Sequence, residues 1–417
     1  KVIRIKMKKA PSPLVSLIPI VVLVLLLFAT IRTFGSDALS GGSQVSLLTT
    51  TAICILIGMV FYKIPWKDYE LAITNNIAGV ATAIIILLII GALSGIWMIS
   101  GVVPTLIYYG MQIIHPSFFL ASTCIICALI SVMTGSSWTT IATIGIALMG
   151  IGKAQGFEDG WIAGAIISGA YFGDKISPLS ETTILASSIT DTPLFRHIRY
   201  MMITTVPSLI ITLIIFTVAG LSHDASNTQH IAEVATALNE KFHITPWLLI
   251  VPVATGILIA RKVPSIVTLF LSTLLAGVFA LIFQPELLQE ISGVAVSGFD
   301  SLFKGLMMTV YGATNLHTDN AVLTDLIATR GMAGMMNTIW LILCAMCFGG
   351  AMTASGMLGS ITSIFVRFMK KTVSVVGATV CSGLFLNLTT ADQYISIILT
   401  GNMFRDICAK KGYESCL

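Results

Sequence analysis

The sequence predicts an all-α membrane protein that crosses the bilayer several times. Hydrophobic residues make up 56% of the 417 residues and charged residues 10%, whereas a soluble domain carries about 25% charged residues. The mean hydropathy is +0.94, and many apolar runs approach the length of about 20 residues that a helix needs to cross a bilayer. This composition fits a polytopic membrane protein and excludes soluble classes.

Residues 1–13 form a basic tail, and its cations are Lys1, Arg4, Lys6, Lys8 and Lys9. This cluster explains the net charge of +4, so no nucleic-acid partner is required. Because positive residues flank the cytoplasmic ends of membrane helices, we expect a cytoplasmic N-terminus; binding of the tail to anionic lipid is the alternative. The first apolar run, 14–31, is too long for a signal peptide core, so we expect a retained span.

The remaining apolar runs predict roughly ten crossings in total. Candidates for full spans are 14–31, 45–62, 77–99, 118–133, 201–221, 246–260, 265–283, 335–352 and 373–388. Pieces too short to cross alone are expected to be half-helices of broken spans, at 139–150, 161–172, 302–311 and 396–404.

A polar linker at 222–245 divides the chain into two halves. Its centre, 231–242, has apolar residues at helical spacing and predicts a surface helix. We therefore expect a first transmembrane repeat at 14–221 and a second at 246–417.

Matching segments indicate that the two halves are repeats. The Ser-Gly pairs at 100–101 and 355–356 match, as do 131–134 and 386–389, both at an offset of 255 residues (356 minus 101 and 389 minus 134). A third match has a shorter offset, 219 residues (277 minus 58). Repeats with interrupted helices in corresponding positions are typical of secondary transporters. Since 174 plus 255 is 429, beyond residue 417, we expect the second repeat to be C-terminally incomplete.

The segment 168–183 is polar although apolar runs flank it. It contains Asp174, Lys175, Glu181 and several hydroxyls, with a Gly and a Pro that we expect to interrupt any helix. A charged side chain in hydrocarbon costs roughly 2.5–3.5 kcal/mol on insertion scales, and an unsatisfied backbone group is also costly. Such a segment is tolerated where it is buried in protein or lines a watery cavity. It therefore predicts an ion or substrate site made from a broken membrane helix.

The side chains of this segment suggest different roles. A carboxylate such as Asp174, which must lose its proton to bind a cation and regain one after release, couples two ions by competition. Lys175 could act as an internal countercharge, and Ser177 and Glu181 could supply oxygens. For Glu181 the alternative is that it opens a helix capped by Ser180.

A second polar break, at 134–140, offers the hydroxyls of Ser136, Ser137 and Thr139. Oxygen ligands of this kind suit a hard cation. The alternative is that these hydroxyls bond back to their own helix, which also bends helices.

The matching break in the second half, at 387–394, contains Thr389 and Asp392. An Asp between two apolar runs seldom has a packing explanation, so we expect Asp392 to be a second exchangeable carboxylate and Thr389 to supply an oxygen. Capping of the following helix by Asp392 is the alternative, and both roles can coexist at an inward-pointing helix N-terminus.

Eight cysteines lie mostly within apolar runs. The pairs Cys124/Cys127 and Cys344/Cys347 have the spacing of metal or redox pairs and would share a helix face. No His or further Cys is nearby in sequence, so we expect these residues to pack as small apolar side chains, without a disulfide framework.

Four motifs resemble the NhaC family of Na+/H+ antiporters: GDKISPLSETT at 173–183, TGSSWTT at 134–140, DLIATRGM at 325–332 and ADQY at 391–394. The resemblance covers nearly the whole chain. It implies a bacterial inner-membrane transporter of the wider ion-transporter superfamily, with inverted repeats and hairpin-like broken helices. The family includes Na+/H+ antiporters and a malate–lactate exchanger coupled to Na+ and H+. A family member normally continues past this C-terminus into a second polar motif.

We therefore expect a secondary antiporter that exchanges Na+ for H+, with Na+ at Asp174, Asp392 and Ser137. The expected partners are these ions and membrane lipid. Formation of a homodimer is an open possibility, and no cofactor is expected. An enzyme is disfavoured because no nucleophile–base pair stands out, and an ATP-driven pump because no nucleotide motif is present. Two alternatives remain: an exchanger of small organic anions of the malate/lactate type, and a channel.

Overall fold

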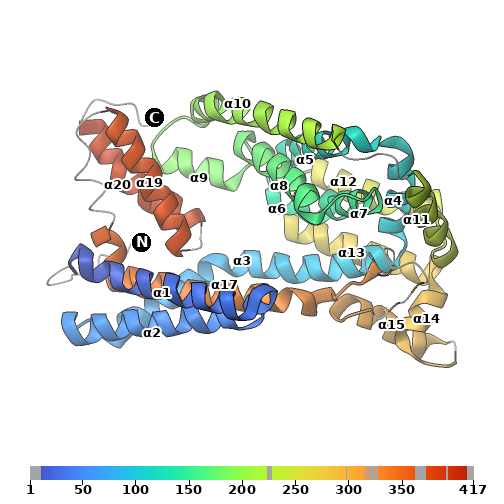
Figure 1. Ribbon diagram of the computed structural model, residues 1–417, viewed down its shortest axis with the longest axis horizontal. Helices are drawn as coiled ribbons and strands as arrows, with labels where there is room; N and C mark the ends of the chain where they lie inside the picture. The colour runs from blue at the N-terminus through green and yellow to red at the C-terminus, as the bar shows by residue number, and fades with distance from the viewer. Residues whose placement is uncertain are drawn as a thin grey trace. The chain divides into compact units, whose positions relative to one another are not determined.

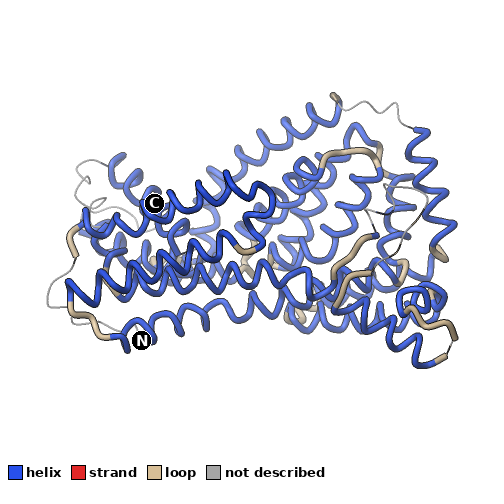
Figure 2. Tube along the Cα trace, turned by 60° about the horizontal axis from the view of Figure 1, so that its bottom comes forward, coloured by secondary structure: helices blue, strands red, loops and turns tan. Residues whose placement is uncertain are grey.

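The computed structural model describes residues 11–222, 228–296, 298–361 except 315, 317, 319–323, 325 and 326, and then 372–390 and 393–410. Helices joined by turns account for these residues, and no strand occurs among them (Figure 2). Hydrocarbon offers no partner for backbone N–H and C=O groups, so spanning segments satisfy them within a helix. The predicted all-α class is confirmed.

The chain forms two compact units, each assembled from segments far apart in sequence. Unit 1 contains Lys1–Ile84, Leu185–Thr192 and Met336–Leu417, and unit 2 contains Ile85–Ile184 and Pro193–Met335. Each unit thus includes parts of both predicted repeats, and the division of the chain into repeats at 14–221 and 246–417 stays a prediction.

Unit 1 contains helix α2, which packs against α1 and α17 (Figure 1). Its core buries Cys54, Tyr69 and Phe348. The Ser12 hydroxyl caps α1 by accepting from the Val15 N–H. The helices with residues in this unit are α1 (Pro13–Phe34), η1 (Gly35–Ser40), α2 (Gly42–Tyr62), α3 (Trp66–Ile99, first part), α9 (Glu181–Ile189, second part), α17 (Met336–Ala354), α19 (Thr372–Thr390) and α20 (Gln393–Lys410).

Unit 2 holds the larger core, in which α5 packs along α8 and α10 packs against both (Figure 1). Besides the remaining parts of α3 and α9, its helices are α4 (Val102–Ile113), η2 (Pro116–Phe118), α5 (Phe119–Thr134), α6 (Ser137–Thr140), η3 (Ile141–Gly145), α7 (Ile146–Ala154), α8 (Asp159–Ile176), α10 (Leu194–Leu221), α11 (Thr228–Lys241), η4 (Pro246–Leu249), α12 (Ile250–Ala260), α13 (Ser265–Phe283), α14 (Pro285–Ser292), α15 (Phe299–Tyr311) and η5 (Gly331–Met335).

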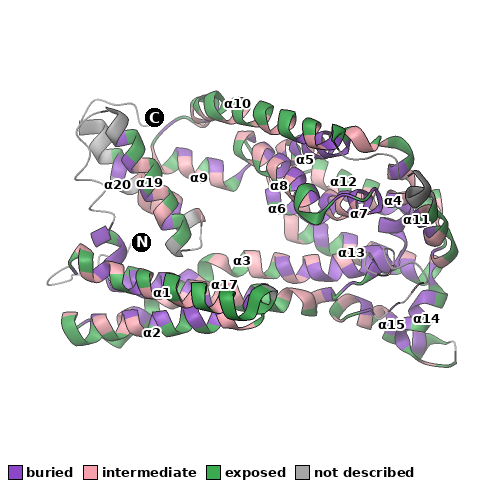
Figure 3. Cartoon of the chain, in the orientation of Figure 1, coloured by how far each residue is buried: buried purple, intermediate pink, exposed green. Residues whose placement is uncertain are grey.

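Seven helices among the described residues are long and apolar enough to cross a membrane, or up to eight if the bent pair Glu233–Lys241 and Pro246–Ala260 is one span. The sequence predicted roughly ten because shorter runs were also counted; 373–388, for example, corresponds to the shorter apolar helix Val375–Leu388. The apolar stretch of α10 is 6% buried, and Figure 3 shows this helix exposed along most of its length. An apolar surface of this kind is suited to lipid. The polytopic class is confirmed.

The predicted surface helix at 231–242 is α11. Val234, Leu238 and Phe242 are buried at a spacing of four residues, which places them on one face of the helix. The amphipathic pattern therefore indicates a helix whose apolar face is packed against the protein. Lys241, in the last turn of the helix, is partly buried, and its ammonium group contacts the Glu290 carboxylate of α14 at 2.9 Å.

The Ser-Gly pairs that suggested a repeat have the same local structure in both units. At the first pair, which follows α3, the Ser100 N–H donates to the carbonyl four residues earlier and the Gly101 N–H to the carbonyl three residues earlier, and Gly101 has φ +84°. At the second pair, which follows α17, Ser355 and Gly356 make the same two bonds, and Gly356 has φ +69°. In both, a left-handed glycine ends one helix and starts another. The repeat itself stays a prediction.

Candidate functional site

The polar break at 134–140 ends α5 and begins α6. Gly135 adopts φ +66°, a left-handed conformation that glycine tolerates and that terminates helices. Ser136 then caps α6, with its hydroxyl accepting from the Thr139 N–H at 3.2 Å. The predicted interruption of the helix is confirmed, and its cause is the glycine followed by a Ser cap.

Hydroxyls line this break and contact one another. Thr139 Oγ1 lies 3.1 Å from Ser136 Oγ and 2.8 Å from Ser265 Oγ, which lies at the start of α13. Thr140 Oγ1 donates to the Ser136 carbonyl at 3.0 Å. Bonds back to the local backbone, the alternative interpretation, therefore do occur, yet Thr139 also connects the break to a second helix.

The half-helix predicted at 139–150 is part of a continuous helical run, because α6, η3 and α7 follow one another without a gap. Its central segment, Ile141–Gly145, is π-helical. Short π segments inside α-helices occur frequently at functional sites. Here the segment directly follows the hydroxyl-bearing turn.

Asp174 lies in the last turn of α8, half-buried, and its carboxylate contacts the break. The Ser137 hydroxyl donates to Asp174 Oδ2 at 2.9 Å, and Ser137 itself is 1% exposed. Two of the polar segments predicted from sequence, 134–140 and 168–183, are thus brought together by a carboxylate–hydroxyl contact.

Close packing of α8 on α5 makes this contact possible. A Cβ added at Gly169 would collide with the Cys124 carbonyl of α5, and one at Gly173 with the Ala128 carbonyl. The Ser131 hydroxyl of α5 donates to the Ala170 carbonyl of α8 at 2.5 Å. Small residues spaced four apart let membrane helices approach closely. Gly173 was expected to interrupt the helix; this was wrong, because α8 continues through it to Ile176 and the glycine serves helix packing.

Beyond α8 the chain turns back over the break. Ser177 is fully buried; its hydroxyl donates to the Val132 carbonyl at 2.8 Å and accepts from the Leu179 N–H at 3.2 Å. A Cβ at Gly135 would lie 2.7 Å from the Leu179 backbone. Ser177 therefore holds the two interruptions against each other, and an additional role as an ion ligand stays a prediction.

At the start of α9, Glu181 takes the role that was the alternative to an ion ligand: it opens a helix that Ser180 caps. The helix begins at Glu181, which is exposed, and the Ser180 hydroxyl accepts from the Thr183 N–H at 3.4 Å. Thr183 is buried and its hydroxyl contacts the Lys175 carbonyl at 3.1 Å. This hydroxyl satisfies a carbonyl at the end of α8. The Lys175 side chain is exposed, and its role as countercharge stays a prediction.

The second predicted carboxylate, Asp392, lies outside the described residues, as does the side chain of Thr389, although the backbone of Thr389 belongs to α19. Their predicted roles are therefore untested.

Sequence reasoning missed Ser265, Ser131 and the glycines of α8. The spacing of Gly169 and Gly173 is a signal of close helix approach that could have been found. Ser265 opens an apolar span and has no such signal, because its contact with Thr139 arises from packing of α13.

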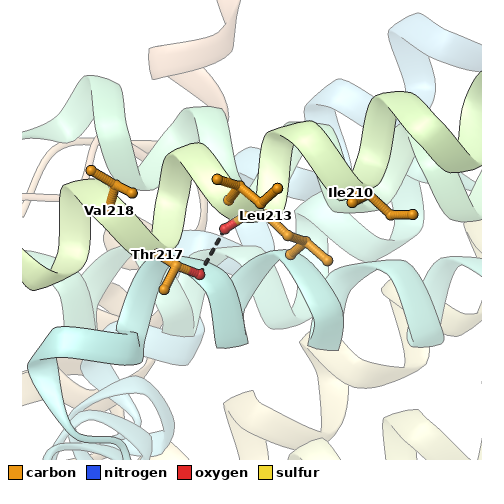
Figure 4. A pocket seen from close by; sticks show the side chains of 5 residues that line it. Ile210, Leu213, Thr217 and Val218 are labelled. Atoms are coloured by element: carbon orange, nitrogen blue, oxygen red, sulfur yellow. Dashed lines mark hydrogen bonds between the residues drawn. The ribbon is translucent and has the colours of Figure 1, made fainter.

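A shallow groove elsewhere in unit 2 offers no such chemistry. It runs along α10 and is lined by Ile210, Leu213, Ile214, Thr217 and Val218 (Figure 4). The hydroxyl of Thr217 donates to the Leu213 carbonyl of its own helix at 2.7 Å. The groove is apolar and suits a lipid chain.

The arrangement around Asp174 suits a hard cation. Its groups are one carboxylate and several hydroxyl and carbonyl oxygens, the ligands that hard cations prefer. Within the described ranges, no three His, Cys, Asp or Glu residues converge on one point. A polytopic helical protein with interrupted helices, at which a carboxylate meets hydroxyls, belongs to the class of secondary ion transporters.

Comparison with known proteins gives the family. The model of the Na+/H+ antiporter family matches residues 5–184 and 169–416. This chain belongs to that family. It is 35% identical to the Na(+)/H(+) antiporter NhaC of Bacillus subtilis, over 88% of this chain and 78% of that protein. It is 37% identical to NhaC of Alkalihalophilus pseudofirmus, over 86% of this chain and 75% of that protein. It is 36% identical to a malate-2H(+)/Na(+)-lactate antiporter of B. subtilis, over 87% of this chain and 75% of that protein.

Proposed function

We propose that this protein is a secondary antiporter that exchanges Na+ for H+ at the site formed by the α5–α6 break and the end of α8. The observation that carries the proposal is the 2.9 Å contact between the Ser137 hydroxyl and Asp174 Oδ2 at an interrupted helix. The choice of ions is supported by membership of the Na+/H+ antiporter family and by the two NhaC relatives.

Competition for one carboxylate provides the coupling. When Asp174 is ionised, its oxygens and the Ser137 hydroxyl oxygen can coordinate Na+, and the hydroxyl proton turns away from the ion. When a proton binds Asp174, the carboxyl group is neutral and the site loses its attraction for Na+. An uncompensated charge is costly inside a membrane protein. The site therefore changes orientation with either Na+ or H+ bound, and each ion leaves before the other enters.

The hydroxyl network fixes the geometry of this exchange. Thr139 contacts both Ser136 and Ser265, and Ser177 ties the end of α8 to α5. These contacts hold Ser137 opposite Asp174 while the occupant changes. We propose Asp392 as a second exchangeable carboxylate and Thr389 as a supplier of an oxygen, and we expect no cofactor beyond the transported ions.

The test is Na+-driven pH change in proteoliposomes. Asp174→Asn keeps the shape of the side chain but can neither ionise nor carry the exchanged proton, so exchange should be abolished; Asp392→Asn should do the same. Asp159→Asn is the matched control, because Asp159 lies on the same helix and pairs with Lys153 at 3.2 Å, at an exposed position. Exchange at the wild-type rate in Asp174→Asn would refute the assignment.

A second candidate function is Na+-coupled exchange of small organic anions. It is favoured by the malate-2H(+)/Na(+)-lactate antiporter of B. subtilis, which is 36% identical to this chain. Uptake of radiolabelled malate into the same proteoliposomes, with and without Na+, separates the two functions. Uptake that requires Na+ would favour the organic anion.

We further propose that the protein resides in the bacterial inner membrane with its N-terminus in the cytoplasm. The basic residues of the tail support this orientation, and a reporter fused before residue 11 tests it. Lipid, or a second copy of the chain in a homodimer, would cover the exposed apolar face of α10; the mass of the purified particle distinguishes these cases.

A further inference from the structure

Unit 1 contains a cluster of sulfur atoms that ion exchange at Asp174 does not use. Cys54 Sγ on α2 lies 3.7 Å from Met352 Sδ and 3.7 Å from Met357 Sδ. All three side chains have 0% exposure. The Ser355 hydroxyl is a fourth neighbour, also 3.7 Å from the thiol. A thiol and two thioethers therefore converge in the buried interior of the unit.

The helix break after α17 brings the two thioethers together. In an uninterrupted α-helix, residues five apart point in different directions. Here α17 ends at Ala354, Gly356 adopts φ +69°, and a new helical segment starts at Met357. The change of direction turns Met352 and Met357 toward the same atom of α2. The contact is a product of the break.

We propose that Cys54, Met352 and Met357 bind a soft monovalent metal ion, Cu+ or Ag+. Thiolate and thioether ligands select Cu(I) over harder metals. With metal–sulfur bonds of about 2.3 Å, three sulfurs around one ion lie about 4 Å apart. The separations of Cys54 Sγ from each thioether, both 3.7 Å, are close to this value.

Charge balance selects the monovalent ion. On binding, the Cys54 thiol releases its proton to water and the sulfur forms a bond to the metal, which is neither oxidised nor reduced. One thiolate and one monovalent cation give a neutral site. A divalent ion would leave a net positive charge in an apolar interior, which is unfavourable.

The Tyr69 hydroxyl is a second, independent sign of a site. It is fully buried, and no hydrogen-bond partner for it is found within the described residues. Gly58, one turn after Cys54 on α2, lies directly against the Tyr69 oxygen, so this hydroxyl is at the face of α2 that carries the thiol. This buried donor therefore faces the side of α2 that carries the cluster, and it bonds to none of the cluster's atoms.

Silver ion is the probe, because it has the charge and softness of Cu+ without its redox chemistry. The purified full-length protein is incubated with Ag+ and excess glutathione, separated from free ligand, and its silver content is measured. Glutathione is titrated, because three converging sulfurs hold silver to a higher glutathione concentration than a single protein sulfur does. Met357→Leu and Met352→Leu should each retain one silver ion fewer per chain than the wild type, and so should Cys54→Ser.

Met346→Leu is the matched control, because Met346 lies on the same helix as Met352 with the same 0% exposure, and it is not among the sulfur neighbours found for Cys54 in the described residues. It should retain as much silver as the wild type. Methionine-to-leucine changes conserve volume and keep every cysteine, so the test stands even if Cys54→Ser does not fold. Equal silver content in Met357→Leu, Met352→Leu and the wild type would overturn the proposal, as would equal losses in Met346→Leu.

Discussion

Replacing Gly173 by alanine should separate α8 from α5 and remove most of the exchange activity. An added Cβ would lie 2.6 Å from Ser131 Cβ and 2.7 Å from the Val132 nitrogen, where ordinary contact begins at 3.4 Å. Since both neighbours belong to the body of α5, relief requires the helices to move apart by about 0.8 Å or more, the difference between 3.4 and 2.6 Å.

A displacement of this size is enough to break the site. Asp174 follows Gly173 directly, and its contact with Ser137 would lengthen from 2.9 Å to about 3.7 Å, beyond the range of a hydrogen bond. Misplacement of reacting groups by about 1 Å can lower a rate about 100-fold. The cost in stability is smaller, because overpacking by about 1–3 kcal/mol is partly offset by the helix propensity of alanine, about 1 kcal/mol better than that of glycine.

The assay is initial Na+-driven proton flux in proteoliposomes, with thermal unfolding in detergent measured in parallel. Gly164→Ala is the control on the same helix, because its added Cβ would meet Phe216 at an ordinary distance of 3.8 Å; flux should be unchanged. If Gly173→Ala were folded and as active as Gly164→Ala, the close approach of α5 and α8 would not position Asp174, and the reasoning would be wrong.

Three further predictions concern the same site. Ser137→Ala removes a hydroxyl bonded to the Asp174 carboxylate; such bonds contribute about 1.5 kcal/mol or more, so the Na+ concentration for half-maximal flux should rise about tenfold, and an unchanged value would contradict the contact. Thr139→Val and Ser265→Ala should each lower the unfolding temperature. The double variant should lower it by less than the sum of the two single effects, because both changes remove the same bond; fully additive effects would argue against a bond between these two hydroxyls. Gly135→Ala should be destabilised by about 1–2 kcal/mol from its left-handed backbone alone and should lose flux, which parallel melting and flux measurements would detect.

Much of the site was predictable because membrane energetics are strict. Asp174 and Ser137 stood out since polar groups between apolar runs need a compensating partner. Sequence did not reveal that these two residues contact each other, because that pairing depends on how closely α8 approaches α5. The glycines that permit the approach were visible, but Gly173 was interpreted as a helix breaker. In a chain with few large polar groups, a glycine inside a helix more often marks a packing surface.

The fold was predicted less evenly. Long apolar runs such as 14–31 and 265–283 appear as helices, because length and hydropathy alone define a span. Short runs were ambiguous, and 139–150 proved to lie within a slightly longer helical run, 137–154, that contains a π segment. Assembly of each unit from distant segments could not be predicted, since apolar helices of similar composition offer many equivalent partners.

The π segment at 141–145 also determines how the residues on either side of it are aligned. A π turn holds one residue more than an α turn, and each residue of an α-helix advances the direction of its side chain by about 100°. Conversion of the segment to an α-helix at unchanged length would rotate everything before it by about that angle relative to α7. Ser137 would then face another neighbour even though no ligand had been altered. Deletion of one residue within the segment would instead restore an α turn with both flanks still aligned, so this helix tolerates loss of the extra residue better than substitutions that force the segment into the α form.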